Sequence, residues 1–143
     1  MWNISINIMK EKYSKEIIKL AKIAYKKGEV PVGAIITKND KILARAYNKI
    51  ETSKDATMHA EILAIKKASK KLKNWRLNDC EMYVTLEPCT MCSSAIELSR
   101  IKKVYYLVKR DKKISIKKSK YIHYNTFTIE ALNLLQSFFK KVR

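Results

Sequence analysis

Glycine and proline are scarce in this sequence, which holds two of each among 143 residues. No low-complexity linker and no internal repeat interrupts the chain, so nothing marks a boundary between domains. A chain of this length can bury a sizeable core without the help of disulfides. The sequence therefore predicts one domain that covers residues 1–143.

Cysteine is also rare, with three in the chain. Cys89 and Cys92 lie in one short motif, which leaves Cys80 without a partner for a disulfide. This usage is typical of a reducing compartment and predicts the cytoplasm, with an organelle matrix as the alternative. The apolar runs are too short to span a membrane, so no membrane association is expected. Residues 1–9 lack the basic segment of a signal peptide and the arginines of a transit peptide.

Acidic residues are few: 13 stand against 31 basic ones, which gives a formal net charge of +18. A protein this basic attracts a polyanion through counterion release, so the charge predicts binding to nucleic acid. The basic residues comprise 26 lysines and five arginines, however, and A+T-rich codons would produce the same skew. Selection for a nucleic-acid partner and compositional bias both remain as explanations.

The basic residues are densest between residues 109 and 120, and Tyr121 and Tyr124 follow directly. Basic side chains with aromatic rings nearby suit a phosphate backbone and unstacked bases. A solvated surface loop would have a similar composition. The candidates for RNA contact in this segment are Lys109, Arg110, Lys112, Lys113, Lys117 and Lys118.

Two short motifs, HAE at residues 59–61 and PCTMC at residues 88–92, hold a set of metal ligands. His59, Cys89 and Cys92 supply three ligands, the number that a catalytic zinc takes from protein while water keeps the fourth position. Glu61 is a carboxylate that ligation does not require, and it is placed to move protons near the metal. The pattern His-x-Glu followed by Pro-Cys-x-x-Cys is typical of zinc nucleobase deaminases.

Two other interpretations of the cysteine pair are weaker. A redox pair is expected to open a helix after a strand without a His-x-Glu partner. A structural zinc site would need a fourth ligand, for which Cys80 and His123 remain. Cys80 stands just before an apolar run, where a small buried thiol is the commoner role. The catalytic zinc site is therefore favoured.

The hydrophobic pattern predicts helices and strands that alternate along the chain. Helices are expected over 13–24, 57–71, 88–98 and 129–141, and strands over 30–36, 42–47, 81–86, 103–108 and 121–127. A polar turn at 38–41 joins the first two strands into an antiparallel pair, whereas crossover helices make the later strands parallel. We expect an α/β protein, with a mixed five-stranded sheet between helices on both faces, which makes three layers, α/β/α.

The same pattern predicts which helical residues share a face and where the motifs lie. The helix over 57–71 places Ile62, Ile65 and Ser69 on one side, and the helix over 129–141 turns Leu132, Leu135 and Phe139 inward. Cys89 and Cys92 fall one helical turn apart, and His59 lies at the start of the preceding helix. Two helix N-termini therefore converge on one metal, where their dipoles favour thiolates.

Several motifs resemble those of the bacterial-type tRNA-specific adenosine deaminases, members of the zinc-dependent cytidine and deoxycytidylate deaminase superfamily. They are EVPVGA at 29–34, YN at 47–48, DATMHAE at 55–61, NWRL at 74–77, YVTLEPC at 83–89 and SRI at 99–101. The resemblance runs from about residue 22 to residue 104, and it implies a cytidine-deaminase-like three-layer α/β/α fold. It implies hydrolysis of adenosine to inosine at the wobble position of a tRNA anticodon, with ammonia released.

This resemblance also implies the parts of the site and the partners. One zinc per chain would hold the attacking hydroxide while Glu61 shuttles protons, and the anticodon stem-loop of a tRNA would be the partner. Asn48 would hydrogen-bond the flipped base, although a turn asparagine that satisfies its own backbone is the alternative. The pocket would be formed by Glu29, Val30, Pro31 and Ala60, and an RNA arm would rest near Phe139 and Arg143. A homodimer is implied, with Met91 and Ile96 of residues 90–98 as interface candidates.

The sequence departs from the family pattern at two places. Gly28 and Gly33 are its only glycines, so the glycine-containing loop that usually follows residue 104 is rebuilt here. Counting without gaps puts Lys109 and Arg110 at the family's Arg-Asp pair, which leaves the ribose-contacting acid unassigned. Residues 56 and 58 are Ala and Met where Pro and a small residue are usual, which predicts a less rigid loop before the zinc helix.

Two alternative functions follow from the same residues. A deaminase of a free nucleobase or nucleoside, such as cytosine, guanine or cytidine, would share the zinc site. A zinc-stabilised RNA-binding module without activity is the other, but Glu61 would then have no task. The charge and the NWRL motif favour an RNA substrate over a small one.

Overall fold

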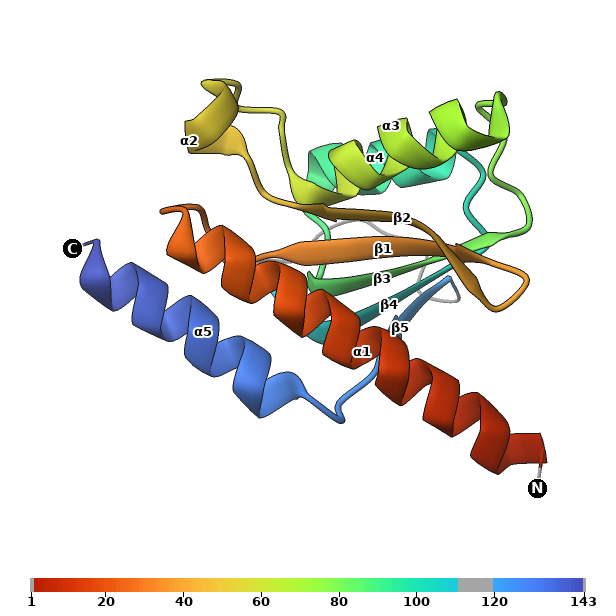
Figure 1. Ribbon diagram of the computed structural model, residues 1–143, viewed down its shortest axis with the longest axis horizontal. Coiled ribbons are helices and arrows are strands. Elements are labelled where there is room, and N and C mark those ends of the chain that lie inside the picture. The colour runs from red at the N-terminus through yellow and green to blue at the C-terminus, as the bar shows by residue number, and fades with distance from the viewer. Residues whose placement is uncertain (1, 111–119, 143) are drawn as a thin grey trace.

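The computed structural model describes residues 2–110 and 120–142, without the side chains of residues 2–6. The elements along the chain are α1 (Trp2–Lys26), β1 (Gly33–Lys38), β2 (Lys41–Tyr47), α2 (Ile50–Ser53), α3 (Ala60–Leu72), β3 (Cys80–Leu86), α4 (Thr90–Leu98), β4 (Lys103–Val108), β5 (Tyr121–His123) and α5 (Thr128–Lys141). The strands form one sheet in the order β2-β1-β3-β4-β5 (Figure 1). β1 is antiparallel to both β2 and β3, while β3, β4 and β5 run parallel. The predicted mixed five-stranded sheet is confirmed.

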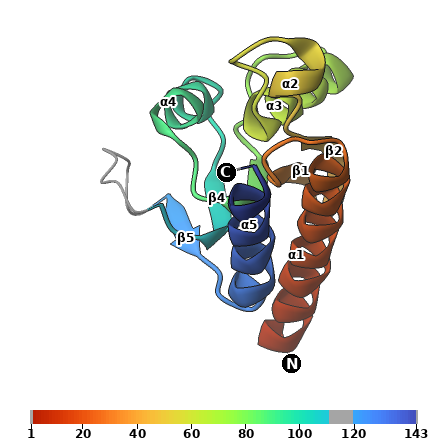
Figure 2. The same ribbon diagram turned by 90° about the vertical axis from the view of Figure 1, so that its left-hand side faces the viewer.

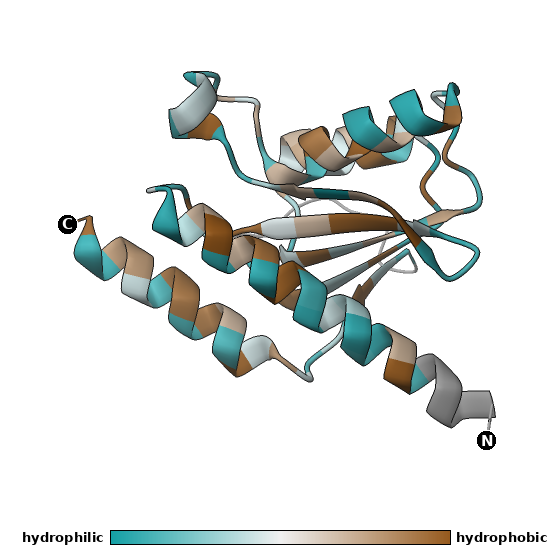
Figure 3. Cartoon of the chain, in the orientation of Figure 1, coloured by the Kyte–Doolittle hydropathy of each residue, from teal (hydrophilic) through white to brown (hydrophobic). Residues whose placement is uncertain are grey.

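Helices cover both faces of this sheet, so the three-layer arrangement is also confirmed (Figure 2). Successive residues of a strand point to opposite faces, and β1 shows the consequence. Ala34 and Ile36 pack with α3 and α4, whereas Ile35 between them packs with α1 and α5. Hydrophobic and hydrophilic residues alternate along the helices, as expected of helices with one buried face (Figure 3). None of the helices described is both long and apolar enough to cross a membrane.

The two glycines fix the position of α1 against the sheet. Gly28 ends α1 at φ +78°, a conformation that costs glycine little, and its N–H donates to the Tyr25 carbonyl at 3.1 Å. Gly33 starts β1 directly under the helix. A Cβ at residue 33 would meet the backbone oxygen of Ile17 and lie 2.7 Å from the Cβ of Leu20. The close contact between α1 and β1 therefore requires glycine at this position.

Several predicted details were wrong at the level of individual residues. α1 extends well before residue 13, β1 begins three residues later than expected, β5 ends at His123 instead of 127, and α2 was not predicted. The buried face of α3 consists of Ala60, Glu61, Ala64 and Ala68, while Ile62, Ile65 and Ser69 are only partly buried. The buried face of α5 consists of Ala131, Leu135 and Phe138, and Leu132 and Phe139 are exposed. Small residues let α3 lie close to the sheet, so its largest side chains do not mark its core face.

Candidate metal centre and active site

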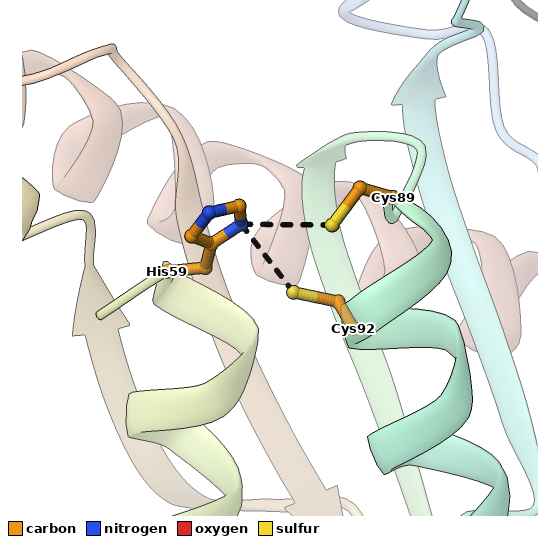
Figure 4. A group of neighbouring side chains, drawn as sticks. All are labelled: His59, Cys89 and Cys92. Atoms are coloured by element: carbon orange, nitrogen blue, oxygen red, sulfur yellow. Dashed lines mark hydrogen bonds between the residues drawn. The ribbon is translucent and has the colours of Figure 1, made fainter. Parts of the chain in front are cut away.

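Two helices begin side by side near the C-terminal end of β3, and each begins at a predicted metal ligand (Figure 4). His59 is the residue that immediately precedes α3, and Cys89 holds the same position before α4. Cys92 lies in the first turn of α4 and is buried. Since β3 and β4 are parallel, this end of the sheet is where an α/β fold commonly binds its ligand. The predicted convergence of two helix N-termini is confirmed.

The three side chains fit a tetrahedral zinc ion. The sulfurs of Cys89 and Cys92 lie 3.7 Å and 3.5 Å from Nδ1 of His59. Ideal zinc bonds to nitrogen and sulfur, arranged tetrahedrally, would separate these atoms by about 3.6 Å. All three ligand atoms lie within 4.8 Å of one another. Cys80 is buried at the other end of β3, the end at which that strand begins, as expected of a thiol that binds no metal.

Without a cation, the two thiols share their protons unequally. Hydrogen bonds with Cys92 and His59 lower the pKa of Cys89 to about 3. The hydrogen bond to Cys89, together with burial, raises the pKa of the Cys92 thiol. The hydrogen bond to Cys89 raises the pKa of His59 as well. A metal requires both thiolates and the neutral imidazole, so its binding releases protons and weakens as the pH falls.

Glu61 lies in the first turn of α3 and is 2 % exposed. Burial raises the pKa of its carboxyl group, and the neighbouring His59 opposes that shift. Its side chain also contributes to the raised pKa of Cys92 through a hydrogen bond, which places the carboxyl group directly beside the candidate metal ligands. A buried carboxylate next to a metal is suited to accepting and donating a proton.

Asn48 follows β2 directly and is buried beside the start of α3. Its side-chain oxygen accepts a hydrogen bond from the N–H of Ala60 at 2.8 Å. The asparagine thus satisfies one of the free N–H groups in the first turn of α3, across 12 residues of sequence. Ala60 itself is fully buried, and its N–H is occupied by this contact. The substrate contacts predicted for these two residues stay predictions.

Three further residues predicted for the pocket lie between α1 and β1. Val30 is partly buried and Pro31 is buried. Glu29 is 1 % exposed, and its carboxylate accepts hydrogen bonds from the N–H groups of Glu51 and Thr52 at 3.0 and 2.7 Å. These bonds give Glu29 a task within the chain that the sequence did not suggest.

Three of the predicted RNA contacts, Lys109, Arg110 and Phe139, can be placed, together with the neighbouring Lys120. Lys109 is exposed, Phe139 is exposed on α5, and Lys120 pairs with Glu97 at 3.1 Å. Arg110 is partly buried: its N–H donates to the carboxylate of Glu87 at 3.0 Å and its Nε to the Glu87 carbonyl at 2.6 Å. Residues 112, 113, 117, 118 and 143 (Lys112, Lys113, Lys117, Lys118 and Arg143) lie outside the described residues, so their contacts stay predictions.

Glu87 was missed, although a signal was present. It is one of 13 acids in a very basic chain and stands two residues before Cys89. Its backbone N–H also donates to the Val108 carbonyl at 2.8 Å. Glu87 therefore ties the end of β4 to the segment that carries the candidate metal ligands Cys89 and Cys92.

The comparison with known families agrees with this geometry. The family described as the cytidine and deoxycytidylate deaminase zinc-binding region matches residues 8–108. The chain belongs to this deaminase family. The match contains all three candidate ligands and Glu61, so this deaminase has the zinc-binding region of its family.

Individual proteins similar to this chain include deaminases of tRNA and of a free nucleobase. A curated protein of Aquifex aeolicus, named tRNA-specific adenosine deaminase, is 46% identical, with 94% of this chain and 96% of the relative covered. A solved structure from a study of tRNA:A34 deaminases and A-to-I editing is 30% identical with a TM-score of 0.80, covering 87% of this chain and 99% of that one. The solved guanine deaminase of Bacillus subtilis is 32% identical with a TM-score of 0.67, covering 91% and 93%.

Proposed function

We propose that this deaminase converts adenosine to inosine at the wobble position of a tRNA anticodon. The observation that carries the proposal is the joint geometry of His59, Cys89 and Cys92, with the buried carboxyl group of Glu61 beside them. Such a site supports hydrolytic deamination of a nucleobase. The high identity to a relative named tRNA-specific adenosine deaminase, over nearly the full length of both chains, supports tRNA as the substrate.

In the proposed reaction, water and adenosine give inosine and ammonia. One zinc per chain, when bound, is a Lewis acid that lowers the pKa of water to about 7. Glu61 accepts one proton from the water and passes it to N1 of the purine ring, and it then transfers the second water proton to the departing amine, which leaves as ammonia. The C6–N bond breaks, and the water oxygen remains on C6. Burial of Glu61 keeps bulk water from competing for this proton.

Asn48 is the proposed contact to the base. Its side-chain oxygen is used by the N–H of Ala60, so its amide N–H groups are the part that can donate to an acceptor of the purine. The bond to Ala60 fixes the orientation of this amide. Val30 and Pro31 follow Glu29 on the neighbouring segment and are proposed to form the wall of the pocket.

The tRNA is proposed to be held by charge as well as by the pocket. The net charge of +18 supports an extended contact with phosphates. Lys109 and Arg110 stand at the end of β4, on the segment that Glu87 ties to the metal ligands. Their place next to the centre supports contacts to the anticodon stem-loop. The cytoplasm, or an organelle matrix, is the proposed compartment, since tRNA is available there and the thiols stay reduced.

A homodimer through α4 is also proposed. α4 has one charged residue in nine, Glu97, and exposes Met91 and Leu98 on its outer side. Two copies of a strongly basic chain repel each other, and an uncharged helix face is where that repulsion is weakest. Ile96, which the sequence suggested for the interface, is fully buried in the core and cannot contribute. Sedimentation should give twice the chain mass of 16.7 kDa. Leu98→Lys should yield the monomer, whereas Leu132→Lys on α5 should not.

The function is tested by measuring ammonia and inosine from adenosine-containing anticodon stem-loops. Glu61→Ala should keep zinc and RNA affinity but lose turnover by about 10²–10⁴-fold, the typical contribution of acid–base catalysis. Glu16→Ala, on the surface, serves as the control. Near-normal turnover in Glu61→Ala would exclude the proton-transfer role and leave a binding module as the better explanation.

Deamination of a free nucleobase is the second candidate, and the similarity to the guanine deaminase of Bacillus subtilis favours it. The same assay decides between the two when free guanine, cytosine and cytidine replace the stem-loop. Turnover of free guanine that exceeds turnover of the stem-loop would reject the tRNA substrate while leaving the zinc chemistry intact.

A further inference from the structure

The segment between β2 and α3 carries functional residues at both of its ends, Asn48 and His59. These ends are held together beside the metal centre. The N–H of Lys49 donates to the Met58 carbonyl at 3.0 Å, and Asn48 accepts from Ala60 at 2.8 Å. Residues 50–57 therefore form a loop that leaves the fold and returns at one narrow neck, with α2 standing away from the sheet (Figure 1).

This loop has no hydrophobic core of its own. α2 contains no buried residue, and the side chains of residues 51–57 are exposed. The residue that precedes α2, Lys49, makes no side-chain hydrogen bond to the free N–H groups of the helix. A four-residue helix is not stable by itself, because its first turn costs more conformational entropy than its hydrogen bonds return. Something outside the loop must hold it.

Glu29 supplies these contacts from 22 residues away. Oε1 accepts the N–H of Glu51 at 3.0 Å, and Oε2 accepts both the N–H and the hydroxyl of Thr52 at 2.7 Å. Both carboxylate oxygens are thus used, and the side chain is almost completely buried. A carboxylate at the N-terminal end of a helix replaces the missing cap, and its negative charge is attracted by the positive end of the helix dipole.

The backbone of Glu29 is itself rigidly placed. Its N–H donates to the Ala24 carbonyl at 2.9 Å, directly after the left-handed Gly28 that ends α1. α1 packs its buried face on the sheet through Ile17 and Ala21. The carboxylate therefore connects the core of the protein to a loop that is otherwise exposed.

We propose that Glu29 is a positioning residue of the deaminase site, which fixes the 50–57 loop, and through it Asn48 at the neck, in the arrangement that the substrate RNA meets. Glu29 does not contact the base in this proposal, in contrast to the wall position expected from the sequence. The consequence for turnover rests on the proposed deamination of tRNA. The contact between Glu29 and the 50–57 loop does not depend on that function.

Hydrogen exchange tests the contact directly. The amides of Glu51 and Thr52 should exchange slowly in the wild-type protein and at least about tenfold faster in Glu29→Gln, which cannot accept at both positions. Glu16→Gln is the matched control, because Glu16 pairs with Arg45 at 2.8 Å on the surface. Thr52→Val removes one hydroxyl donor at an exposed residue and should give a smaller change in the same direction. Equal exchange in wild type and Glu29→Gln would overturn the proposal.

Steady-state kinetics tests the consequence. Glu29→Gln should raise KM for the stem-loop by about tenfold while kcat changes less than about threefold, because the reacting groups stay in place. Zinc content should be unchanged. An unchanged KM with faster amide exchange would overturn the positioning role. If the wild-type protein released no ammonia from stem-loops, the proposed function would fail instead, and the exchange result would still decide the contact.

Discussion

Cys80 and Cys92 show how neighbours decide the chemistry of a residue. Both thiols are buried in the same domain. Cys80 lies among apolar side chains, and burial raises the pKa of its thiol, so it stays protonated and inert. Cys92 lies against Cys89 and His59 at a helix N-terminus, where a cation can replace its proton. Position in the fold, and not burial alone, separates a ligand from a packing residue.

The cysteines can be tested as a matched pair. Cys92→Ser should lose zinc. If zinc is present at 100 times its Kd, losing the bound ion removes about 2.7 kcal/mol of folding stability. Cys80→Ser should keep full zinc, although a buried hydroxyl without a partner costs about 1–3 kcal/mol. Metal analysis and thermal unfolding measure both effects. Full zinc occupancy in Cys92→Ser would show that the ligand assignment is wrong.

Glu29 should also make stability depend on pH. Burial favours the neutral form, but hydrogen bonds from Thr52, Glu51 and Ile50 outweigh it and hold the pKa of Glu29 below its ordinary value. The stabilisation is therefore complete above the unfolded pKa of about 4.3 and is lost as the pH falls through the folded pKa. The difference in unfolding free energy between wild type and Glu29→Gln should shrink in this acid range.

Denaturant unfolding at several pH values measures this difference. The nearby loop also carries the charged residues Lys49, Glu51, Lys54 and Asp55, which are present in both proteins. The pKa of Asp55 is lowered by its bonds to Thr57, and this effect cancels in the comparison. A difference that stays constant from neutral pH to pH 3 would contradict the ionised contact.

At the scale of elements, the contact between α1 and β1 depends on the absence of one side chain. Gly33 is crossed by α1 so closely that a methyl group would overlap the helix backbone. The N–H of Gly33 is meanwhile held by the hydroxyl of Thr85 on β3 at 3.1 Å. The strand therefore cannot shift away from the helix without breaking its connection to the centre of the sheet.

Gly33→Ala should destabilise the protein by more than about 2 kcal/mol. The added methyl group would overlap backbone atoms, which cannot move aside as a flexible side chain can. Gly28→Asn is the control, because no atom lies within 4 Å of its Cβ position and asparagine tolerates positive φ. Its cost should stay below about 1 kcal/mol. Chemical denaturation compares the two. A smaller effect at Gly33 than at Gly28 would mean that α1 can tilt to make room.

The elements that could be predicted from the sequence are those with a strong local signal. The clustering of the candidate metal ligands follows from the two motifs, and the strands β3 and β4 follow from continuous apolar runs. α2 could not be found, because its stability comes from Glu29, 22 residues away, and not from its own four residues. The faces of α3 and α5 were also misassigned. On α3, alanines form the buried face because close packing against the sheet leaves little room for larger side chains, and on α5 it is Phe138 that is buried and not Phe139.

At the scale of the whole molecule, the charge is the property that the fold does not explain. Ion pairs among the described residues use few of the basic groups, such as Lys22 with Glu130. The surplus is available to a polyanion, and codon composition is the competing explanation for it. The salt dependence of tRNA binding can show which of these basic residues contact the phosphates.

Replacement of Lys112, Lys113, Lys117 and Lys118 by neutral residues should weaken tRNA binding and flatten its salt dependence, by roughly one unit of slope for each phosphate that is no longer neutralised. The control replaces four exposed lysines of α1, Lys12, Lys15, Lys19 and Lys26, and removes the same charge. Titrations at several salt concentrations compare the slopes. Equal slopes in both variants would assign the binding to overall charge and not to this segment.

The shortness of β5 has a consequence for how the protein meets its own copies. β5 pairs with β4 at three residues only, and the Leu107 carbonyl beyond it accepts from the Thr128 hydroxyl at 2.6 Å and from Nε2 of His123 at 2.9 Å. Side chains of this protein thus use a backbone acceptor that an added strand from another molecule would otherwise pair with. The opposite edge strand, β2, carries Lys41 and Arg45, whose charge discourages edge-to-edge pairing. Aggregation by strand addition is opposed at both edges, which leaves helix faces as the surfaces for self-association.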